Sequence, residues 1–419
     1  MAQGRNDELI TVLDIGTSKV CAMIVRKPDG SDLQVLGTGQ RESKGISRGY
    51  IADMAQTEAA IRAAVEQAER IAGVNIESAW VGFSAGGLVS KVTTIEADLG
   101  GYRIEKAHIR DLHMAGLKSI DPEGMEILHA HPTLYTLDGL QGVKNPLGLH
   151  ADQLGVDIHA VLTERSPLRN LDHCVRSAYL SVDGVVASPV ATGHAILSAE
   201  ERELGVALVE LGAGVTNVSL FAGGMLVGLM SIPFGAADIT DAVATEFGMR
   251  RSLAERIKCF HGSATTSPRD NHDMIEIAQV TDDEAGESPR ITRAQLITII
   301  RERLEDLMGQ VGGALDEMGF TGPVGRQVVL TGGGAEMKGI ADFAQGALGR
   351  TVRTGRPTAL AGLPEAHSGP AFATLAGLAR FAAEGPADLR VMENQVQLVT
   401  TAKGGSLWAR FMAAFKSEY

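Results

Sequence analysis

The chain has 419 residues, enough for two or more domains with complete cores. Its net charge of −13 argues against a nucleic-acid partner held through phosphate contacts. The three cysteines lie far apart and do not have the spacing of a zinc site. Their number is odd, so they do not form a disulfide framework, and this usage fits a reducing cytosol. We expect neither a signal peptide nor a transmembrane helix, because no apolar run has the required length and flanks.

The first part of the chain alternates strand-like and helix-like patterns after a polar lead. Apolar residues recur at helical spacing over residues 53–72, and Gly73 marks the end of that helix. Strands that alternate with helices indicate an α/β sheet. The strands are expected near residues 10–15, 18–26, 32–40 and 78–84.

Residues 85–163 interrupt this alternation and predict a small α+β insertion, with one helix near 104–118 and short strands around it. The spacing His129-x-His131 can place two imidazoles on one strand face as metal ligands. No cysteine or carboxylate cluster lies near them in the sequence. We therefore interpret the histidines of the insertion as partly buried or surface residues.

The second half of the chain repeats the plan of the first. A capping box is predicted at Ser252 and Glu255, at the start of one of its helices. Before this half, a helix near 166–180, a strand near 182–187 and a linking helix near 189–197 are expected. In the second half, strands are expected near 205–211, 214–222, 225–232 and 274–280, and helices near 236–247, 292–318, 335–348 and 370–383.

Two hairpins of the same design carry the most informative residues. At residues 10–20 an apolar strand ends in Asp14 and turns at Gly16; at 205–221 another strand ends in Glu210 and turns on glycines. A buried carboxylate is costly unless a cation or a hydrogen-bond partner is near it. A glycine turn can direct backbone N–H groups at an anion. The pair therefore predicts a site for Mg²⁺ and phosphate, although a lone Asp14 can also cap its own turn.

A third glycine loop, VVLTGGGAEMKGI at 328–340, follows a buried strand and opens a helix. Such a loop can seat an adenine or a phosphate at a helix N-terminus. One supersecondary unit repeated across half the chain suggests two similar domains that face each other. The three loops together predict a two-lobed nucleotide-binding core.

These loops resemble the motifs of the actin/Hsp70/sugar-kinase superfamily. LDIGTSKV at 13–20 and GVALVELGAGVTNVSLF at 205–221 resemble its two phosphate motifs, and LTGGGAEMKGI resembles its adenosine motif. The insertion, through 126–139 and 145–163, is similar to the subdomain specific to the FtsA family of bacterial cell-division proteins. The C-terminal GGSLWARFMAAFKSEY resembles the membrane-targeting helix of that family.

The resemblance implies an α/β, actin-like two-lobed fold of duplicated ribonuclease-H-like domains, with an inserted α+β subdomain and a C-terminal amphipathic helix. The implied first domain is 1–84 and 164–198, around the insertion 85–163. The remaining parts are a second domain 199–335 with an FtsZ-binding subdomain at about 250–310, a returning segment 336–385, a linker 386–405 and the membrane helix 406–419.

The resemblance also implies a function. Such a protein binds ATP and Mg²⁺, polymerises with itself on the cytoplasmic face of the plasma membrane at the septum, holds the C-terminal tail of FtsZ, and recruits later division proteins through the insertion. The alternatives are a small-molecule kinase and a pilus-assembly ATPase of the same superfamily. A kinase needs a positioned base, and no carboxylate outside the Mg²⁺ positions is available to be nominated. The terminal amphipathic helix counts against the pilus protein.

By family analogy, Asp14 and Glu210 act on Mg²⁺ through water. The residues expected around the phosphates are Gly16, Thr17, Ser18, Lys19, Gly212, Gly214, Thr216 and Asn217. Those expected around the adenosine are Gly332, Gly333, Gly334 and Met337, with Glu255 and Lys258 near the ribose, where Lys258 can also be a solvated helix charge. The superfamily usually has Asp at both 210 and 217. Because Mg²⁺ demands near-ideal geometry, we expect at most slow hydrolysis.

Two further surfaces are expected to bind partners. Arg290, Arg293 and Arg303 can pair with carboxylates of the acidic FtsZ tail, or they can be ordinary exposed helix charges. At 100° per residue, one face of the C-terminal helix gathers apolar side chains, with the basic residues at its edge and on the far side. The membrane residues are then Leu407, Trp408, Phe411, Met412 and Phe415, with Arg410 and Lys416 for an anionic surface.

Overall fold

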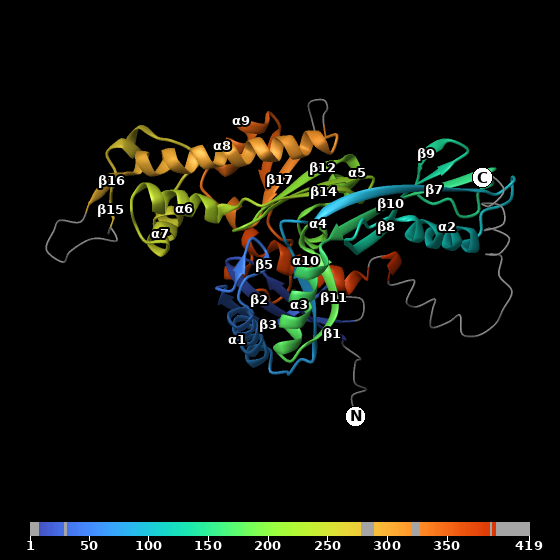
Figure 1. The fold of residues 1–419 in the computed structure, drawn as a ribbon, viewed down its shortest axis with the longest axis horizontal. Helices are drawn as coiled ribbons and strands as arrows, with labels where there is room; N and C mark the ends of the chain where they lie inside the picture. The colour runs from blue at the N-terminus through green and yellow to red at the C-terminus, as the bar shows by residue number, and fades with distance from the viewer. Residues whose placement is uncertain (1–7, 29–31, 278–288, 321–326, 386–387, 391–419) are drawn as a thin grey trace. The chain divides into compact units, whose positions relative to one another are not determined.

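Figure 1 shows the ribbon of the computed structural model, which describes residues 8–28, 32–277, 289–320, 327–385 and 388–390. These residues form two compact units. The core unit contains the described residues up to Val89 and those from Thr163 to Gly385. The inserted unit contains residues 90–162 together with 388–390.

The first sheet of the core unit has the strand order β11-β6-β1-β2-β3. Strand β1 runs antiparallel to β2 and parallel to β6. Helix α1 (Met54–Ala72) packs on β3, where a Cβ at Gly39 would lie 1.8 Å from the backbone oxygen of Ala64. The strands are β1 (Glu8–Ile15), β2 (Lys19–Lys27), β3 (Gln34–Glu42), β6 (Ser78–Phe83) and β11 (Ser181–Ala187).

The second sheet repeats this pairing. In the core unit its order is β18-β17-β12-β13-β14, and β12 runs antiparallel to β13 and parallel to β17. All six residues of β12 are buried, as expected for a central strand covered on both faces. The predicted repeat of one supersecondary unit is thus confirmed. The strands are β12 (Val206–Leu211), β13 (Thr216–Ala222), β14 (Met225–Ile232), β17 (Gln327–Thr331) and β18 (Thr351–Thr354).

Helices cover both sheets of the core unit. The longest, α8, begins at a capping box in which Thr292 accepts from the backbone of Gln295, and it lies beside α9 (Figure 1). The other helices are α3 (Arg165–Ser177), α4 (Ser188–Ile196), α5 (Ala199–Leu204), α6 (Ala236–Glu246), α7 (Arg251–His261), α8 (Arg293–Glu317), α9 (Ile340–Leu348) and α10 (Ala373–Glu384). Short strands are β4 (Ile46–Ser47), β5 (Tyr50–Ile51), β15 (Met274–Glu276) and β16 (Arg290–Thr292).

The inserted unit is the predicted α+β insertion, a sheet with one helix. Its strand order is β7-β10-β8-β9. Its apolar core includes Ile104, Leu112 and Ile158, and Leu389 from far along the chain joins them. The elements are β7 (Val89–Asp98), α2 (Lys106–Ser119), β8 (Glu126–Leu137), β9 (Leu140–Val143) and β10 (Gln153–Thr163). The first residue of β7, Val89, is the last residue of the preceding segment of the core unit.

Two helix starts differ from the prediction. The prediction of a capping box at Ser252 is wrong, because α7 begins at Arg251 and Ser252 lies inside its first turn. The helix expected over 335–348 is broken, because Gly339 adopts a left-handed φ of 76°. A short 3₁₀ helix, η2 (Gly333–Glu336), therefore precedes α9.

The two other differences concern the last helix and the histidines. The final helix starts as the 3₁₀ turn η4 (Pro370–Phe372) before α10. The histidines His129 and His159 are 1% and 0% exposed, not partly buried or at the surface.

Within the ranges that the structure describes, no helix combines the length and the apolar character needed to cross a bilayer.

The close packing of α10 on α4 generates a stability prediction. A Cβ at Gly377 would lie 2.1 Å from the backbone oxygen of Ala191, and a backbone atom cannot rotate away. We expect Gly377→Ala to lower the free energy of unfolding by about 1–3 kcal/mol. Gly346→Ala in α9 is the matched control, because its Cβ meets nothing within 4 Å and alanine favours the helix by up to about 1 kcal/mol. Thermal melts that rank the two variants in the opposite order would contradict this packing.

Candidate functional site

A cavity of about 610 Å³ lies in the core unit, at the hairpin turns that follow β1 and β12. Helix α7 and the loop at 332–337 complete its wall. All but one of the predicted nucleotide-site residues line it. These are Asp14, Gly16, Thr17, Ser18, Lys19, Glu210, Gly212, Gly214, Asn217, Glu255, Lys258, Gly332, Gly333, Gly334 and Met337.

The two hairpins are built alike around this cavity. The N–H of Gly16 donates to the oxygen of Lys19 at 3.0 Å, and the N–H of Gly212 donates to the oxygen of Val215 at 3.0 Å. In the strand register Asp14 faces Cys21, as Glu210 faces Asn217. The two carboxylates therefore occupy equivalent positions in the two halves of the core unit.

The turns also approach each other closely. A Cβ at Gly214 would lie 3.0 Å from Thr17 Oγ1 and 3.0 Å from the Cα of Arg48. Thr17 Oγ1 accepts from the N–H of Gly49 at 3.1 Å, so its hydroxyl positions the neighbouring loop. Glycine at 214 is thus required by the contact between the two hairpins.

The carboxyl group of Asp14 is hard to ionise in this place. Burial, followed by the negative charge of Glu210, raises its pKa to about 6, while the cation of Lys19 acts in the opposite direction. Two carboxylates that face one cavity are hard oxygen ligands of the kind that Mg²⁺ prefers. The donor set therefore fits a divalent cation, which would relieve the repulsion between them.

Glu210 is held by a network of neutral donors. Its Oε1 accepts from Thr192 Oγ1 at 2.8 Å and from Thr374 Oγ1 at 2.5 Å, and its Oε2 accepts from Asn217 Nδ2 at 3.0 Å. Asn217 Nδ2 also donates to Ser84 Oγ, at 3.0 Å. Sequence reasoning did not identify Ser84, Thr192 or Thr374. Thr192 is one of the few polar residues of the buried helix α4, and this is the only signal that the sequence offered for it.

Lys19 places a cation at the wall of the cavity. Its Nζ lies 3.3 Å from the centroid of the Phe372 ring. Burial lowers its pKa, although the negative charges around it, including Asp14 and Glu336, act to raise it. A partly desolvated ammonium beside a phosphate-sized space is suited to a phosphate oxygen.

Helix α7 contributes a fixed ion pair. Lys258 is 7% exposed, and its Nζ donates to the oxygen of Ala236 at 2.8 Å and to Thr240 Oγ1 at 2.7 Å. The same Nζ lies 2.7 Å from Glu255 Oε2. The alternative that Lys258 is a solvated helix charge is therefore wrong.

Thr216 is the predicted phosphate residue that is not among those lining the cavity. Its side chain is fully buried, and its Oγ1 donates to the oxygen of Phe234 at 2.8 Å. This bond ties β13 to the loop before α6. Successive side chains of a strand point to opposite faces. The side chain of Asn217 therefore faces the cavity, and that of Thr216 points away from it.

The glycine loop after β17 comes close to β12. Gly332 has a φ of 84°, and a Cβ there would lie 2.6 Å from the backbone oxygen of Leu211. A Cβ at Gly333 would meet only the Cβ of Ala371, at 3.9 Å, which is ordinary contact. Position 333 therefore has room for a small side chain, which makes it a suitable place to test the cavity.

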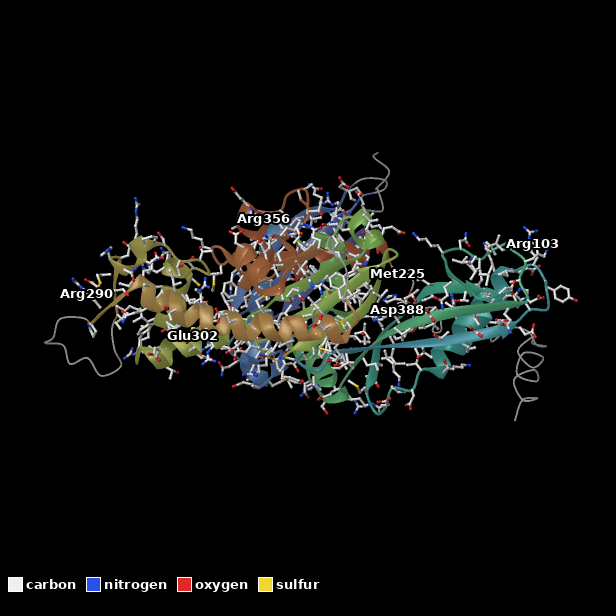
Figure 2. All side chains as sticks on the ribbon, turned by 90° about the horizontal axis from the view of Figure 1, so that it is seen from above. Arg103, Met225, Arg290, Glu302, Arg356 and Asp388 are labelled. Carbon is white, nitrogen blue, oxygen red and sulfur yellow. The ribbon has the colours of Figure 1, made fainter. Side chains whose placement is uncertain are left out.

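The three arginines predicted to bind a partner are in different environments. Arg290 on β16 pairs with Glu276 at 2.7 Å, and Arg303 on α8 pairs with Asp306 at 3.1 Å; all four side chains are at least 47% exposed. Figure 2 shows Arg290 on the hairpin beside the start of α8. Arg293 differs, because it is half-buried, pairs with Asp270 at 2.6 Å and lines the cavity.

The residues predicted to bind the membrane lie outside the described part of the chain. They are Leu407, Trp408, Arg410, Phe411, Met412, Phe415 and Lys416.

Comparison with known proteins decides the family. The family model "Cell division protein FtsA" matches residues 207–377, and the model "SHS2 domain inserted in FTSA" matches 86–162. The chain is 39% identical to the cell division protein FtsA of Agrobacterium fabrum over 384 residues, which covers 89% of this chain and 87% of the relative. The chain belongs to the FtsA family. Its identity to the FtsA protein of Rhizobium meliloti is 37%, over 99% of this chain and 96% of the relative.

Solved structures agree with this assignment at the level of the fold. The PilM–PilN type IV pilus biogenesis complex aligns with a TM-score of 0.63 at 16% identity, over 89% of this chain and 98% of that chain. MreB5 of Spiroplasma citri bound to ADP aligns with a TM-score of 0.51 at 12% identity, over 89% and 96%. This FtsA-family protein is therefore a cell-division protein with the actin-like fold and an inserted SHS2 domain.

The raised pKa of Asp14 generates a prediction about pH. In the unfolded chain this carboxyl has its ordinary pKa of 3.8, so between about pH 4 and pH 6 the folded state holds more protons. Stability then falls as the pH rises through this window, and above about pH 6 the cost reaches up to about 3 kcal/mol. We expect Asp14→Asn to stabilise the nucleotide-free protein at about pH 7.5, and to do so less at about pH 4.5.

Urea unfolding at the two pH values measures this difference. Asp183→Asn, at an exposed aspartate of β11, is the matched control and should change neither value. If Asp14→Asn gives the same gain at both pH values, the shifted pKa is not its cause.

Proposed function

We propose that this FtsA-family protein binds ATP with Mg²⁺ in the cavity of the core unit. The observation that carries the proposal is the equivalent placement of Asp14 and Glu210 at one cavity, each followed by a glycine turn. The cavity volume of about 610 Å³ is within the usual range for small-molecule sites. MreB5 of Spiroplasma citri, which has the same fold, was solved with ADP.

Each part of the wall has a distinct role in this proposal. Asp14 and Glu210 hold the water shell of Mg²⁺, the two hairpin turns face the phosphates, and Lys19 neutralises a phosphate oxygen. The adenosine lies against Gly333 and Met337. The ribose lies near the Glu255–Lys258 ion pair, whose fixed geometry is suited to hydroxyl groups.

Hydrolysis is expected to be slow. Three hydrogen bonds hold the carboxylate of Glu210, and Asn217 supplies an amide instead of a second carboxylate. Two further carboxylates line the cavity: Glu255 is paired with Lys258, and Glu336 accepts from the N–H of Ala371 at 3.4 Å. We expect turnover below about 1 s⁻¹, and faster phosphate release when residues 210 and 217 are both changed to Asp.

The role in division follows from the family. We infer that the protein polymerises on the cytoplasmic membrane at the septum, holds the acidic FtsZ tail near Arg290 and Arg303, and recruits later division proteins through the inserted unit. The exposed pairs of these two arginines are weak, so an acidic peptide can replace the local partners at little cost. Arg293 donates to the carboxylate of Asp270 and to the backbone oxygen of His261, so we assign it a structural role.

A titration with Mg-ATP tests the nucleotide site. Gly333→Asp places a negative charge where the adenosine is proposed to lie, and position 333 has room for the side chain. We expect its affinity to fall at least tenfold, which is about 1.4 kcal/mol. Gly333→Ala is the control, and its affinity should stay within a few-fold of the original. Equal ATP affinity in the original chain and in Gly333→Asp would contradict the placement of the adenosine.

Vesicle sedimentation tests the membrane anchor. With ATP present, the full chain should pellet with anionic vesicles, because a polymer presents many weak anchors at high effective concentration. A chain ending at Gly404, and the variant Trp408→Glu, should stay in the supernatant. Neutral vesicles should bind less of the full chain, since the basic residues contribute about 1 kcal/mol each at an anionic surface. Sedimentation of the truncated chain would show that the anchor lies elsewhere.

A further inference from the structure

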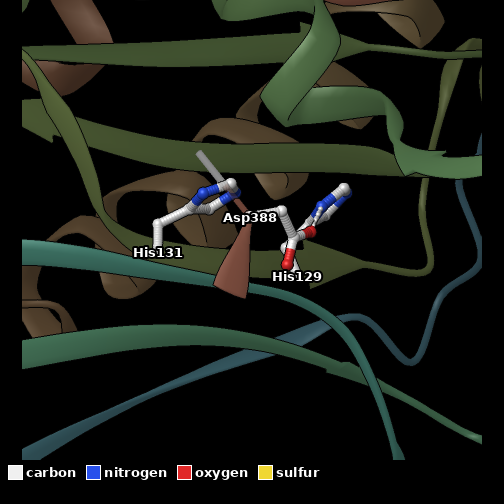
Figure 3. Close-up of side chains that lie close together, drawn as sticks. All are labelled: His129, His131 and Asp388. Carbon is white, nitrogen blue, oxygen red and sulfur yellow. Dashed lines mark hydrogen bonds and ion pairs between the residues drawn. The ribbon is translucent and has the colours of Figure 1, made fainter. Parts of the chain in front are cut away.

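A buried cluster of polar side chains lies in the inserted unit and shares no residue with the sites described above. His129 and His131 lie two residues apart on β8, and Asp388 comes from the segment at 388–390 (Figure 3). One nitrogen or oxygen atom from each of the three residues lies within 4.8 Å of those of the other two. His129 is 1% exposed and Asp388 is 5% exposed, so this is not a chance gathering of surface groups.

The segment that carries Asp388 is firmly attached to the inserted unit. Asp388 Oδ2 lies 3.0 Å from His129 Nδ1. Arg390 donates to Asp388 Oδ2 at 2.8 Å and to the oxygen of Ile127 at 3.0 Å. Leu389 is 1% exposed and belongs to the apolar core. The carboxylate is thus brought to the histidines across more than 250 residues of sequence.

We propose that His129, His131 and Asp388 bind a transition-metal ion of the Zn²⁺ type. Two imidazoles and one carboxylate form a donor set that suits Zn²⁺ and its neighbours, and not Mg²⁺ or Ca²⁺. The ion would fasten the segment 388–390 to strand β8 of the inserted unit.

The distances are compatible with one ion. Ligands at about 2.1 Å from a metal lie about 3.0–3.4 Å apart for angles between 90° and 109°. His129 Nδ1 and Asp388 Oδ2 already have a separation of 3.0 Å. When Nδ1 binds the metal, the single proton of the neutral ring moves to Nε2, so no net proton is released. The ligand atoms of the three residues all lie within 4.8 Å of one another, so the side chains would have to draw closer for all three to reach one ion.

The donors are already in the protonation states that a metal needs. Burial lowers the pKa of His129 to about 4, so its ring is neutral at physiological pH. Burial alone would raise the pKa of Asp388, but the hydrogen bonds from His129 and Arg390 hold it well below its usual range.

Arg390 is the group that opposes the ion, since its guanidinium already pairs with Asp388. Asp388 Oδ1 also accepts from the backbone N–H groups of Arg390 at 3.0 Å and Ala130 at 3.4 Å. A metal would therefore bind Oδ2 and take the place that the His129 Nδ1 hydrogen bond holds there. The guanidinium also neutralises Asp388 when no metal is bound. We therefore expect a weaker site than one with four unopposed ligands.

His159 provides an independent sign that this region takes a further group. Its side chain is 0% exposed, and neither ring nitrogen has a hydrogen-bond partner within the described structure. Burial lowers its pKa to about 3, and the nearby rings of His131 and His129 act in the same direction. A buried imidazole without partners is costly and calls for a water or an ion close by. A metal ion with a bound water would supply that partner.

Titration of the metal-stripped full chain with ZnCl₂ tests the proposal. We expect one site per chain, and at least tenfold weaker binding in both His131→Gln and Asp388→Asn. His150→Gln, at an exposed histidine of the same unit, is the matched control and should bind like the original chain. With Co²⁺ as the probe, visible d–d absorption should appear in the original chain and in the control, and not in the two variants.

Hydrogen exchange gives a second readout. Zn²⁺ should slow amide exchange at 388–390 and at 129–131 in the original chain, and should leave it unchanged in Asp388→Asn. Thermal melts identify a variant that has not folded. If Asp388→Asn is unfolded, the titration of His131→Gln decides. Absence of a zinc site, or equal zinc affinity in the original chain and both variants, would overturn the proposal. The ATP titrations concern the core unit, so their outcome is independent.

Discussion

The core unit depends on two carboxylates that face one cavity, Asp14 and Glu210. Burial of two like charges is unfavourable, and the raised pKa of Asp14 measures part of that cost. The chain limits the cost by surrounding Glu210 with neutral donors and by placing Lys19 near Asp14. In the proposed function, a divalent cation bound at this pair would offset the cost of burying two like charges.

The hydrogen bonds of Glu210 also connect the two halves of the core unit. Thr192 lies on α4, Thr374 lies on α10, and both donate to the same oxygen. These helices pack so closely that a glycine is needed at their contact. The hydroxyl oxygens of Thr192 and Thr374 also lie 3.2 Å apart, so a change at the carboxylate would alter a network that includes both helices. The connection consists of two hydroxyl groups, of Thr192 and Thr374, and the one carboxyl group of Glu210.

Much of the fold could be predicted from the sequence, because its signals are local. The strand–turn–strand pattern and the helix that ends at Gly73 each depend on residues within one turn or hairpin. The site residues in glycine turns were predictable for the same reason. Ser84, Thr192 and Thr374 were not, because their role depends on which helices pack together. The break before α9 was missed because a glycine within a helical pattern does not reveal that its backbone is left-handed. The partner of His129 was missed because Asp388 is distant in the sequence.

The attachment of Leu389 to the inserted unit has a consequence for how the protein is made. Residues 90–162 leave the ribosome early, yet their apolar core is completed by a residue that follows the whole core unit. The insertion must therefore wait, with part of its apolar surface uncovered, while more than two hundred residues are synthesised. A chaperone that shields this surface would bridge the interval. The excised segment 90–162 would retain that uncovered surface permanently.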